Sequence, residues 1–492
     1  MKKKLLVTLL SAAMMTSLLG GCGGSGDSGN ASTPANSDNS ANADDSANAD
    51  DSANADDSAN ADDSANADDA SGDAAEGEAE PDAVTTVGPD SGTHMEMWSF
   101  VDLHNEFYAK MLEKWNEQNP DRQIQITFTT YPFGDMHNKM IMALQTGEGA
   151  PDLCDIERGQ FPNFLQGQPQ LYPLNDALQP YMGDLVQSRF DIYAKDGTYY
   201  GAPTHVGATV MFYNDAIFSQ YGIDYTNIKT WDDYTAVAEQ LKEASGGEVM
   251  MTAVDTGGTD WLWVTMAEHG EDYLDAEGKA SVPASWSKML TMQQGWINDG
   301  LAMVSPEGQL DTEGGRQAIM DGKIASFPKA MWYMSRFVQY MPEETGKWAM
   351  APCPSFEAGQ PRSVGIGGTG TVVTNQSADP ALAADFIAYA KCSEEGCIGI
   401  WENLGFDVCN TSVWSNTDIT QDTSNPYIAY FKTNPFDVLN EIKDEIGAVS
   451  VNANVFTLQD YINTTTLNNI MESGQDVTEA LQEVTDYMEI EQ

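Results

Sequence analysis

The chain contains, between residues 94 and 156, the run HMEMWSF (94–100), NEFYAKMLEKWN (105–116), QIQITFT (123–129), MHNKMIMALQ (136–145) and DLCDI (152–156). The first, third and fifth segments are short and apolar, and Ile124, Ile126 and Phe128 recur at every second position, which predicts β-strands. The second and fourth segments are amphipathic and predict helices, the later of which ends at Gly147. Alternating strands and helices predict a parallel sheet with right-handed crossovers, and hence an α/β domain.

The rest of the chain continues this alternation. Thr230 precedes the amphipathic segment 231–244 and Gly246 follows it, as the N-cap and the stop signal of a helix. We also expect helices at 286–299, 314–321 and 380–391, a strand at 323–327 and a Gly- and Thr-rich extended segment at 364–374. These segments predict a second region of α/β structure.

The first residues have the form of a secretory signal. Lys2–Lys4 precede an apolar stretch at 5–19, which is too short for a confident membrane span. The end of the stretch, LLGGC (18–22), resembles the bacterial lipobox, in which a cysteine after a small residue is lipidated and becomes the N-terminus. We therefore expect residues 1–21 to be removed and Cys22 to be lipidated. The alternative is an ordinary cleaved signal with an incidental cysteine.

No later segment approaches 18 consecutive apolar residues, so no transmembrane helix is expected in the mature chain. The expected location is the extracytoplasmic face of the bacterial cell membrane, with the lipid anchor as the only membrane contact.

Residues 22–92 are predicted to be a lipidated cysteine followed by a disordered tether. The hexamer SANADD occurs five times in succession from Ser40 to Asp69, and residues 23–92 carry 18 acidic residues and no Lys or Arg. Such a tract has too little apolar surface to offset the entropy of ordering. The formal net charge of the whole chain is -52. A surface this acidic argues against nucleic acid as a partner.

Five cysteines follow Cys22. They are Cys154, Cys353, Cys392, Cys397 and Cys409. An odd number cannot pair completely within one chain, and none of them has CxxC spacing. We expect small, mostly buried thiols, no metal site and no cofactor.

Four stretches resemble the family 1 extracellular solute-binding proteins of carbohydrate ABC importers, in the arabinose-, lactose- and multiple-sugar-binding branch related to maltose-binding protein. They are YPFGDMHNK (131–139), GAPD with DIE (149–157), YGAPTHVGAT with YN (200–214), and GKIA followed by MW (322–332). The resemblance covers nearly all of residues 93–492, and the order of the four stretches makes it specific.

The resemblance implies a two-lobed α/β fold of the type II periplasmic-binding-protein kind, with a ligand held between the lobes. The lobes are expected to be joined by crossing segments near His205, near Val364 and at 406–410. The N-terminal lobe is then expected at 93–204 plus 364–410, and the C-terminal lobe at 206–362 plus 411–492.

A neutral sugar offers apolar C–H faces, which stack on aromatic rings, and a hydroxyl rim, which needs Asp, Glu, Asn, Arg or His. Ligands bind beyond the carboxyl ends of parallel strands. Candidates in the first lobe therefore follow the first and third strands of the opening run: Trp98, Phe100, His104, Asp155, Glu157 and Arg158. Asp155 and Glu157 have the alternative of a solvated loop or a helix cap, and Arg158 that of their ion-pair partner.

The remaining candidates lie at the crossings and in the second lobe: His205, Gly368, Thr369, Asp260, Trp261, Trp332 and Tyr461. Trp332 and Tyr461 match aromatic positions of the family. Gly368 would let the backbone approach a ligand closely, and His205 has the alternative of a buried residue in the crossing. Of Trp261 and Trp263, one is expected to face the ligand and the other to lie in the core.

The prediction is a binding protein, not an enzyme, that acts as a monomer, captures a neutral mono- or oligosaccharide and delivers it to the permease subunits of an ABC importer. One alternative is a lipid-anchored glycoside hydrolase that uses Asp155 and Glu157. Neighbours on one strand project side by side, however, whereas hydrolase carboxylates flank the scissile bond, and no HExxH or GxSxG motif occurs. The other alternative is a non-sugar solute, such as a peptide, polyamine or metal complex.

Overall fold

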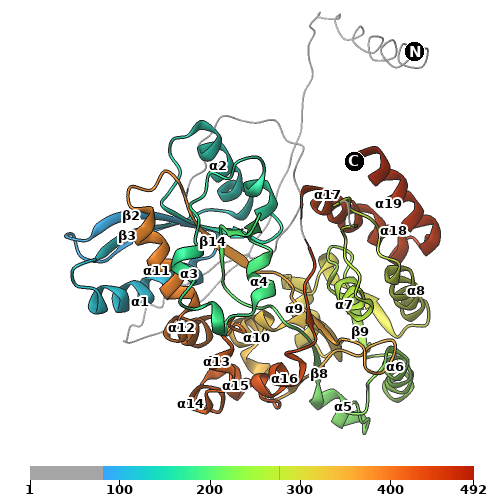
Figure 1. The fold of residues 1–492 in the computed structure, drawn as a ribbon. Helices are drawn as coiled ribbons and strands as arrows, with labels where there is room; N and C mark the ends of the chain where they lie inside the picture. Colours follow the sequence, from blue (N-terminus) through green and yellow to red (C-terminus); the bar gives the residue numbers. More distant parts are fainter. Residues whose placement is uncertain (1–80, 276–277, 451, 492) are drawn as a thin grey trace, which may run out of the picture. The chain divides into compact units, whose positions relative to one another are not determined.

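The computed structural model describes residues 81–275, 278–450 and 452–491. The predicted signal peptide, Cys22 and most of the predicted tether lie outside these residues. The described chain forms two lobes of mixed helices and strands (Figure 1). Within it, every helix is too short or too polar to span a lipid bilayer.

The first lobe is built on a six-stranded sheet with the order β1-β3-β2-β4-β14-β7. Its strands are β1 (Ala83–Val87), β2 (Thr93–Ser99), β3 (Ile124–Thr130), β4 (Leu153–Glu157), β7 (Ala202–Pro203) and β14 (Thr369–Val373). Strand β2 pairs in parallel with both β3 and β4, which confirms the parallel sheet predicted for the opening run. Strand β14 is antiparallel to β4, in a register that sets Thr371 opposite Asp155.

Strand β1 was not expected, because the predicted tether extended to residue 92. Residues Ala83–Val87 pair antiparallel with β3, so that Ala83 lies opposite Thr130. The strand is held mainly through its backbone, and Val84 is 57 % exposed. A strand at the edge of a sheet needs little apolar surface, and composition alone therefore assigned it to the tether.

Helices cover both faces of this sheet (Figure 1). Helices α1 (Asp102–Gln118), α11 (Pro380–Cys392) and α12 (Glu394–Leu404) pack on one face, and α2 (Phe133–Thr146) packs on the other. Side chains alternate between the faces along β4: Leu153 joins the cluster of α1, whereas Cys154 and Ile156 join that of α2. The same alternation directs Asp155 toward α1 and α11.

The second lobe contains a three-stranded antiparallel sheet in which β8 (Thr209–Asn214) lies between β11 (Ser326–Ala330) and β12 (Trp348–Ala351). A parallel pair, β9 (Thr252–Val254) and β10 (Ala302–Val304), lies nearby. Strand β11 begins three residues later than predicted. The helices of this region are α5 (Asp215–Tyr221), α6 (Trp231–Ser245), α7 (Asp260–His269), α8 (Ser285–Asn298), α9 (Glu313–Met320) and α10 (Met334–Tyr340). Thr230 caps α6 as predicted, in a reciprocal capping box with Asp233.

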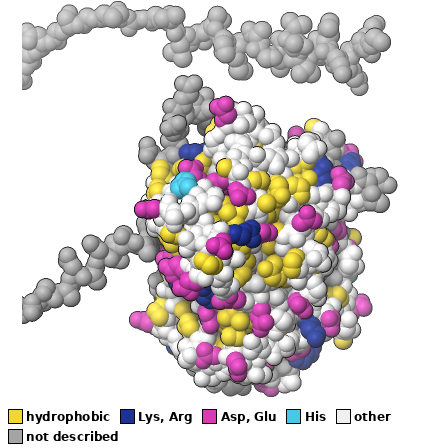
Figure 2. Space-filling model, turned by 60° about the vertical axis from the view of Figure 1, so that its left-hand side comes forward, with side chains coloured by type: hydrophobic (Ala, Val, Ile, Leu, Met, Phe, Trp, Pro, Cys, Tyr) yellow, Lys and Arg dark blue, Asp and Glu magenta, His cyan; other side chains and the backbone are white. Residues whose placement is uncertain are grey.

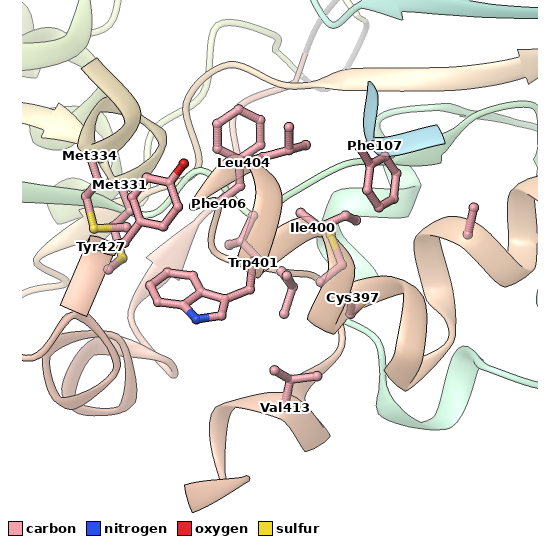
Figure 3. Packing of buried hydrophobic residues seen from close by; sticks show 14 of the residues in the cluster. Phe107, Met331, Met334, Cys397, Ile400, Trp401, Leu404, Phe406, Val413 and Tyr427 are labelled. Carbon is pink, nitrogen blue, oxygen red and sulfur yellow. The ribbon is translucent and has the colours of Figure 1, made fainter. Parts of the chain in front are cut away.

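The last part of the described chain is mostly helical. Its helices are α13 (Thr411–Trp414), α14 (Thr417–Thr420), α15 (Pro426–Tyr430), α16 (Pro435–Ile442), α17 (Ala453–Tyr461), α18 (Leu467–Met471) and α19 (Val477–Glu491). Figure 3 shows Ile400 and Trp401 of α12 in the cluster that joins this part to the first lobe. The ring centroids of Trp401 and Tyr427 are 5.8 Å apart. This packing fixes α12, and through it α11, against the sheet.

Three segments lie side by side where the chain passes between the lobes. The Val206 amide donates to the Asp407 carbonyl over 2.8 Å, and the Ile366 amide donates to the Gly207 carbonyl over 2.9 Å. Gly207 has φ +71°, and a Cβ atom there would lie 2.2 Å from the Ile366 oxygen, so only glycine fits. The remaining short elements are α3 (Asn175–Leu178), α4 (Gln187–Asp191), β5 (Ala194–Lys195), β6 (Thr198–Tyr199), β13 (Ser363–Val364) and β15 (Ile446–Gly447).

The surface agrees with the acidic composition. Figure 2 shows Asp and Glu side chains scattered over one face among polar and apolar groups, with few basic side chains. The five cysteines after Cys22 are all buried free thiols, which confirms the predicted burial.

Candidate functional site

Asp155 is fully buried below the carboxyl edge of the first sheet. His104 Nδ1 lies 3.0 Å from its Oδ2, and the hydroxyls of Tyr108 and Thr371 donate to its Oδ1 over 2.9 and 2.6 Å. Lys391 Nζ lies 3.9 Å from the same Oδ1. Burial acts to raise the pKa of Asp155, but Lys391 and the bond from His104 outweigh it and hold that pKa well below its ordinary value. Asp155 is therefore an ionised internal anchor, not a residue of a solvated loop.

Glu157 ends β4, and its carboxylate serves the turn that follows. Its Oε2 accepts hydrogen bonds from the backbone amides of Gly159 and Gln160, the latter over 3.3 Å. Burial raises the pKa of Glu157, against the opposing effect of the Arg158 charge. The carboxylate thus stabilises the turn, whereas the next helix, at Phe161–Leu165, has no side-chain cap. The Glu157 amide donates over 3.0 Å to Nε2 of His137, a residue that sequence reasoning did not select.

Arg158 extends from the first lobe into the second. Its guanidinium lies 4.5 Å from the ring centroid of Trp263 on α7 and donates to the Val449 carbonyl. Burial, followed by the charge of Arg189, lowers the pKa of Arg158 to about 10, so it remains a cation at neutral pH. A cation held on an aromatic face and on a carbonyl across the junction fixes the two lobes in contact.

The loop from Gly365 to Thr369 passes through the junction and is held by Arg189, which is 1 % exposed. The Arg189 guanidinium donates to the carbonyl of Gly365 over 3.3 Å and to that of Gly367 over 2.7 Å. Gly368 has φ +115°, and a Cβ atom there would lie 3.1 Å from Arg189 Nη2 and 3.3 Å from Tyr193 Oη. The predicted close approach at Gly368 is thus to protein groups, with the Tyr193 hydroxyl beside the loop.

Several polar atoms around this loop are buried and have no hydrogen-bond partner among the described residues. They are Nε of Arg158 and Arg189, the Tyr193 hydroxyl, both ring nitrogens of His205, and Nε1 of Trp332. We call these five residues the junction cluster. Buried polar groups cost free energy when they lack partners, so a concentration of them marks a place suited to a polar ligand.

The members of the junction cluster come from both lobes. Trp332 packs against two hydrophobic clusters, the larger of which includes residues of both lobes, and a Cβ atom on Gly367 would lie 3.1 Å from its indole Nε1. His205 is 6 % exposed, and its ring lies 4.8 Å from that of Phe406. Burial, followed by the charge of Arg189, holds the pKa of His205 well below its ordinary value. The neutral imidazole therefore offers one donor and one acceptor.

The other candidates of the first lobe already have contacts with protein groups. Trp98 is 5 % exposed and has the Lys139 ammonium 5.1 Å from its ring centroid. Phe100 is partly exposed and lies 6.4 Å from the ring of His104. Thr369 lies at the start of β14, where its hydroxyl is 2.5 Å from that of Thr204.

In the second lobe the structure differs from the expectation for Trp261. Its ring is 4 % exposed and lies 5.4 Å from Trp231 and 5.6 Å from Trp296, inside the core. Trp263 is instead the tryptophan that meets the first lobe, through Arg158. Neighbouring positions on a helix point about 100° apart, and the sequence did not show which of the two faces the junction.

Asp260 and Tyr461 both have protein partners. Asp260 Oδ2 lies 2.7 Å from Lys329 Nζ, which also lies 3.1 Å from Asp255. The two carboxylates outweigh the effect of burial and raise the pKa of Lys329. Tyr461 stacks on Tyr487, with the ring centroids 4.3 Å apart.

A surface pocket of about 500 Å³ is lined by residues from distant parts of the chain. Its walls include Leu165, Gln166 and Lys195 from the first lobe and Asn452 and Asn454 from the second. Phe161 and Tyr193 directly precede two residues that line the pocket. Their ring centroids lie 4.7 Å apart. The pocket carries amide side chains and is open to solvent.

Residues 101–394 match the family model of the bacterial extracellular solute-binding proteins, and the chain belongs to this family. It is 40 % identical over 394 residues to an arabinooligosaccharide-binding protein of Halalkalibacterium halodurans, covering 79 % of this chain and 88 % of that protein. An arabinooligosaccharide-binding protein of Bacillus subtilis is 36 % identical over 392 residues, covering 79 % and 90 %. The sugar-binding protein MalE of Xanthomonas citri has the same fold, with a TM-score of 0.68 at 18 % identity over 80 % of this chain and 96 % of that one.

Proposed function

We propose that this protein binds a neutral oligosaccharide, with arabinose oligomers as the leading candidates, at the junction of its two lobes. The observation that carries the proposal is the junction cluster, in which unpartnered buried groups of both lobes surround Gly367 and Gly368. Planar guanidinium groups, an imidazole, a phenol and an indole are the partners that sugar hydroxyls and C–H faces require. The two arabinooligosaccharide-binding relatives support the choice of sugar.

The charges at the junction support a neutral ligand. Arg158 lies beside Glu157, and the buried Asp407 carboxylate lies within the electrostatic reach of Arg189. Each of the two guanidinium groups thus has an acidic side chain near it, which reduces the need for a charged ligand.

Isothermal titration calorimetry with arabinose, arabinotriose, xylose, galactose and maltotriose tests the proposal. We expect a saturable heat with arabinotriose and weaker or no binding of the hexose sugars. The products of an overnight incubation are analysed in parallel, because a hydrolase shortens arabinotriose and a binding protein returns it intact. The absence of binding to every sugar would contradict the proposal and favour a non-sugar solute.

The mechanism we propose is closure of the lobes on the ligand. A ligand that contacts both lobes binds the closed state better than the open one, and it shifts the population by no more than that difference in affinity. The contact of Arg158 with Trp263 and Val449 is made across the junction, and we expect closure to preserve it. Solution scattering by a version lacking residues 23–80, which keeps β1, is expected to show a smaller radius of gyration with saturating arabinotriose.

The closed and loaded protein is then the form that the permease subunits of an ABC importer would accept, at the outer face of the membrane. The proposed anchor is a lipid on Cys22, supported by the LLGGC sequence at 18–22. Replacing Cys22 with Ala and fractionating the cells tests the anchor. A Cys22→Ala protein that remains in the membrane fraction as firmly as the parent would contradict it.

A further inference from the structure

The two ring nitrogens of His104 lie in different environments. Nδ1 faces the interior and lies 3.0 Å from Asp155 Oδ2. Nε2 makes no hydrogen bond with a described residue, and it is not among the buried polar atoms that lack partners in that part of the chain. The side chain is 9 % exposed. Nε2 is therefore the end of the ring that water or a ligand reaches.

His104 belongs to the surroundings of the junction cluster. Its ring lies 6.1 Å from that of Phe406, whose other neighbour is His205 at 4.8 Å. His104 and His205 thus pack against the same ring, that of Phe406.

Asp155 is arranged to accept hydrogen bonds and not to donate them. Its Oδ1 receives the hydroxyls of Tyr108 and Thr371, and its Oδ2 faces His104. Lys391, itself fully buried, places its ammonium 3.9 Å away and donates over 2.6 Å to Thr204. If Asp155 were protonated, its hydrogen would point at one of these donors. Both carboxylate oxygens are therefore acceptors.

An acceptor opposite Nδ1 requires a hydrogen on Nδ1. Lys391 already balances the charge of Asp155, and the other ring neighbours of His104 are the phenylalanines Phe100 and Phe406. The neutral ring with its hydrogen on Nδ1 has a lone pair on Nε2.

We propose that the buried pair of Lys391 and Asp155 holds His104 in the Nδ1–H tautomer, so that Nε2 is presented to the ligand as a hydrogen-bond acceptor that selects a donating sugar hydroxyl. This inference rests on the proposed function. His104 contacts the ligand, whereas Asp155 and Lys391 are positioning residues that act through it. The buried charges of Asp155 and Lys391 therefore determine that Nε2 of His104 accepts a hydrogen bond from the ligand and does not donate one.

The tautomer is measured in the ligand-free protein by long-range ¹H–¹⁵N correlation spectra with ¹⁵N-labelled histidine. The chain has five histidines, and the signals that disappear in His104→Phe are those of His104. We expect a protonated Nδ1 and an unprotonated Nε2. An Nε2–H ring or an imidazolium at neutral pH would overturn the proposal.

A double variant, Asp155→Leu with Lys391→Met, removes both buried charges together and so leaves neither unpaired. In this variant His104 is expected to populate the Nε2–H form. Retention of a fully Nδ1–H ring would show that the pair does not set the tautomer. The wild-type spectrum decides the first part of the proposal even if the double variant does not fold.

Binding of arabinotriose tests the acceptor role. His104→Phe keeps a flat ring of similar size and loses Nε2, and we expect about 10-fold weaker binding, as for one hydrogen bond left unmade. His104→Gln, whose amide oxygen reaches the position of Nε2, should recover part of that loss. His94→Phe is the matched control, because His94 is exposed on β2 and outside the junction, and its affinity should be unchanged.

The two proposals fail in different ways. Wild-type affinity in His104→Phe would overturn the acceptor role while the sugar-binding function stands. A wild-type protein that binds no arabinotriose would end the proposed function and with it the acceptor role. The tautomer spectrum, which needs no sugar, would then still confirm or refute the positioning by Asp155 and Lys391.

Discussion

Asp407 is a buried carboxylate at the crossing between the lobes, and its titration should be visible in the stability of the protein. The side chain is 1 % exposed and accepts hydrogen bonds from the amides of Gly207 and Ala208 over 3.1 and 2.7 Å. Burial raises its pKa from 3.8 to about 7, although the two amides oppose the rise. A carboxyl group whose pKa is higher in the folded state binds more protons when folded, so stability falls as the pH rises from about 4 to about 7.

The size of the effect follows from the same two values. A pKa raised from 3.8 to about 7 corresponds to about 4 kcal/mol, at about 1.4 kcal/mol for each pH unit. This contribution is fully present below pH 4 and fully lost above pH 7. In Asp407→Asn the side chain is neutral at every pH, so the variant should gain about 4 kcal/mol relative to the wild type between pH 4 and pH 8.

The assay is urea unfolding of the wild type and of Asp407→Asn at closely spaced pH values. The difference between the two free energies of unfolding is the quantity of interest, because the other carboxylates of this acidic chain titrate in both proteins. Asp444→Asn, at an exposed aspartate, is the matched control and should give a difference that does not change with pH. A difference for Asp407→Asn that is equally flat would refute the reasoning.

Three further predictions concern binding, the backbone and the tether. Trp332→Ala should weaken arabinotriose binding by about 1–3 kcal/mol in calorimetry, as for other aromatic anchors, and a destabilised variant of normal affinity would place Trp332 in the core alone. Gly207→Ala should lower the free energy of unfolding by about 3 kcal/mol, since it combines a positive φ with a clash. Gly149→Ala has φ +85° in open space and should cost only about 1 kcal/mol; equal losses would contradict the clash. Deleting Ser40–Asp69 should leave the melting temperature and the affinity unchanged, and a loss of either would mean that this tract packs on the folded protein.

Most of the fold could be predicted because its signals are local. Alternation at every second residue identified β3, and a Thr cap with a Gly stop identified α6 to within a residue. Strand β1 was missed because its pairing with β3 depends on backbone groups and not on apolar side chains. The β-branched run at 84–87 is a local strand signal, but it is short and follows directly on the acidic tract.

Only part of the candidate site could be predicted from the sequence, because the residues that contact one another there are far apart in the chain. His205, Arg158 and Trp332 were selected, and the structure brings them together at the junction. Arg189 and Lys391 were not selected, and neither lies in a motif. Lys391 lies 236 residues after Asp155 in the chain, and no sequence pattern on either segment predicts that the two side chains are close. Which of Trp261 and Trp263 faces the junction depends on the direction in which α7 packs, and the sequence does not show that direction.

The pairing of β1 also decides where mechanical load enters the protein. Ala83 lies opposite Thr130, the last residue of β3, so the chain before residue 83 leaves from the carboxyl edge of the first sheet. That is the edge at which β2 and β4 end beside His104 and Arg158. Tension transmitted along the chain that precedes Ala83 would therefore be delivered to this edge, and it would strain the outermost pair of β1 and β3 before any other. The opposite end of the sheet, where β2 and β3 begin, would carry none of this load.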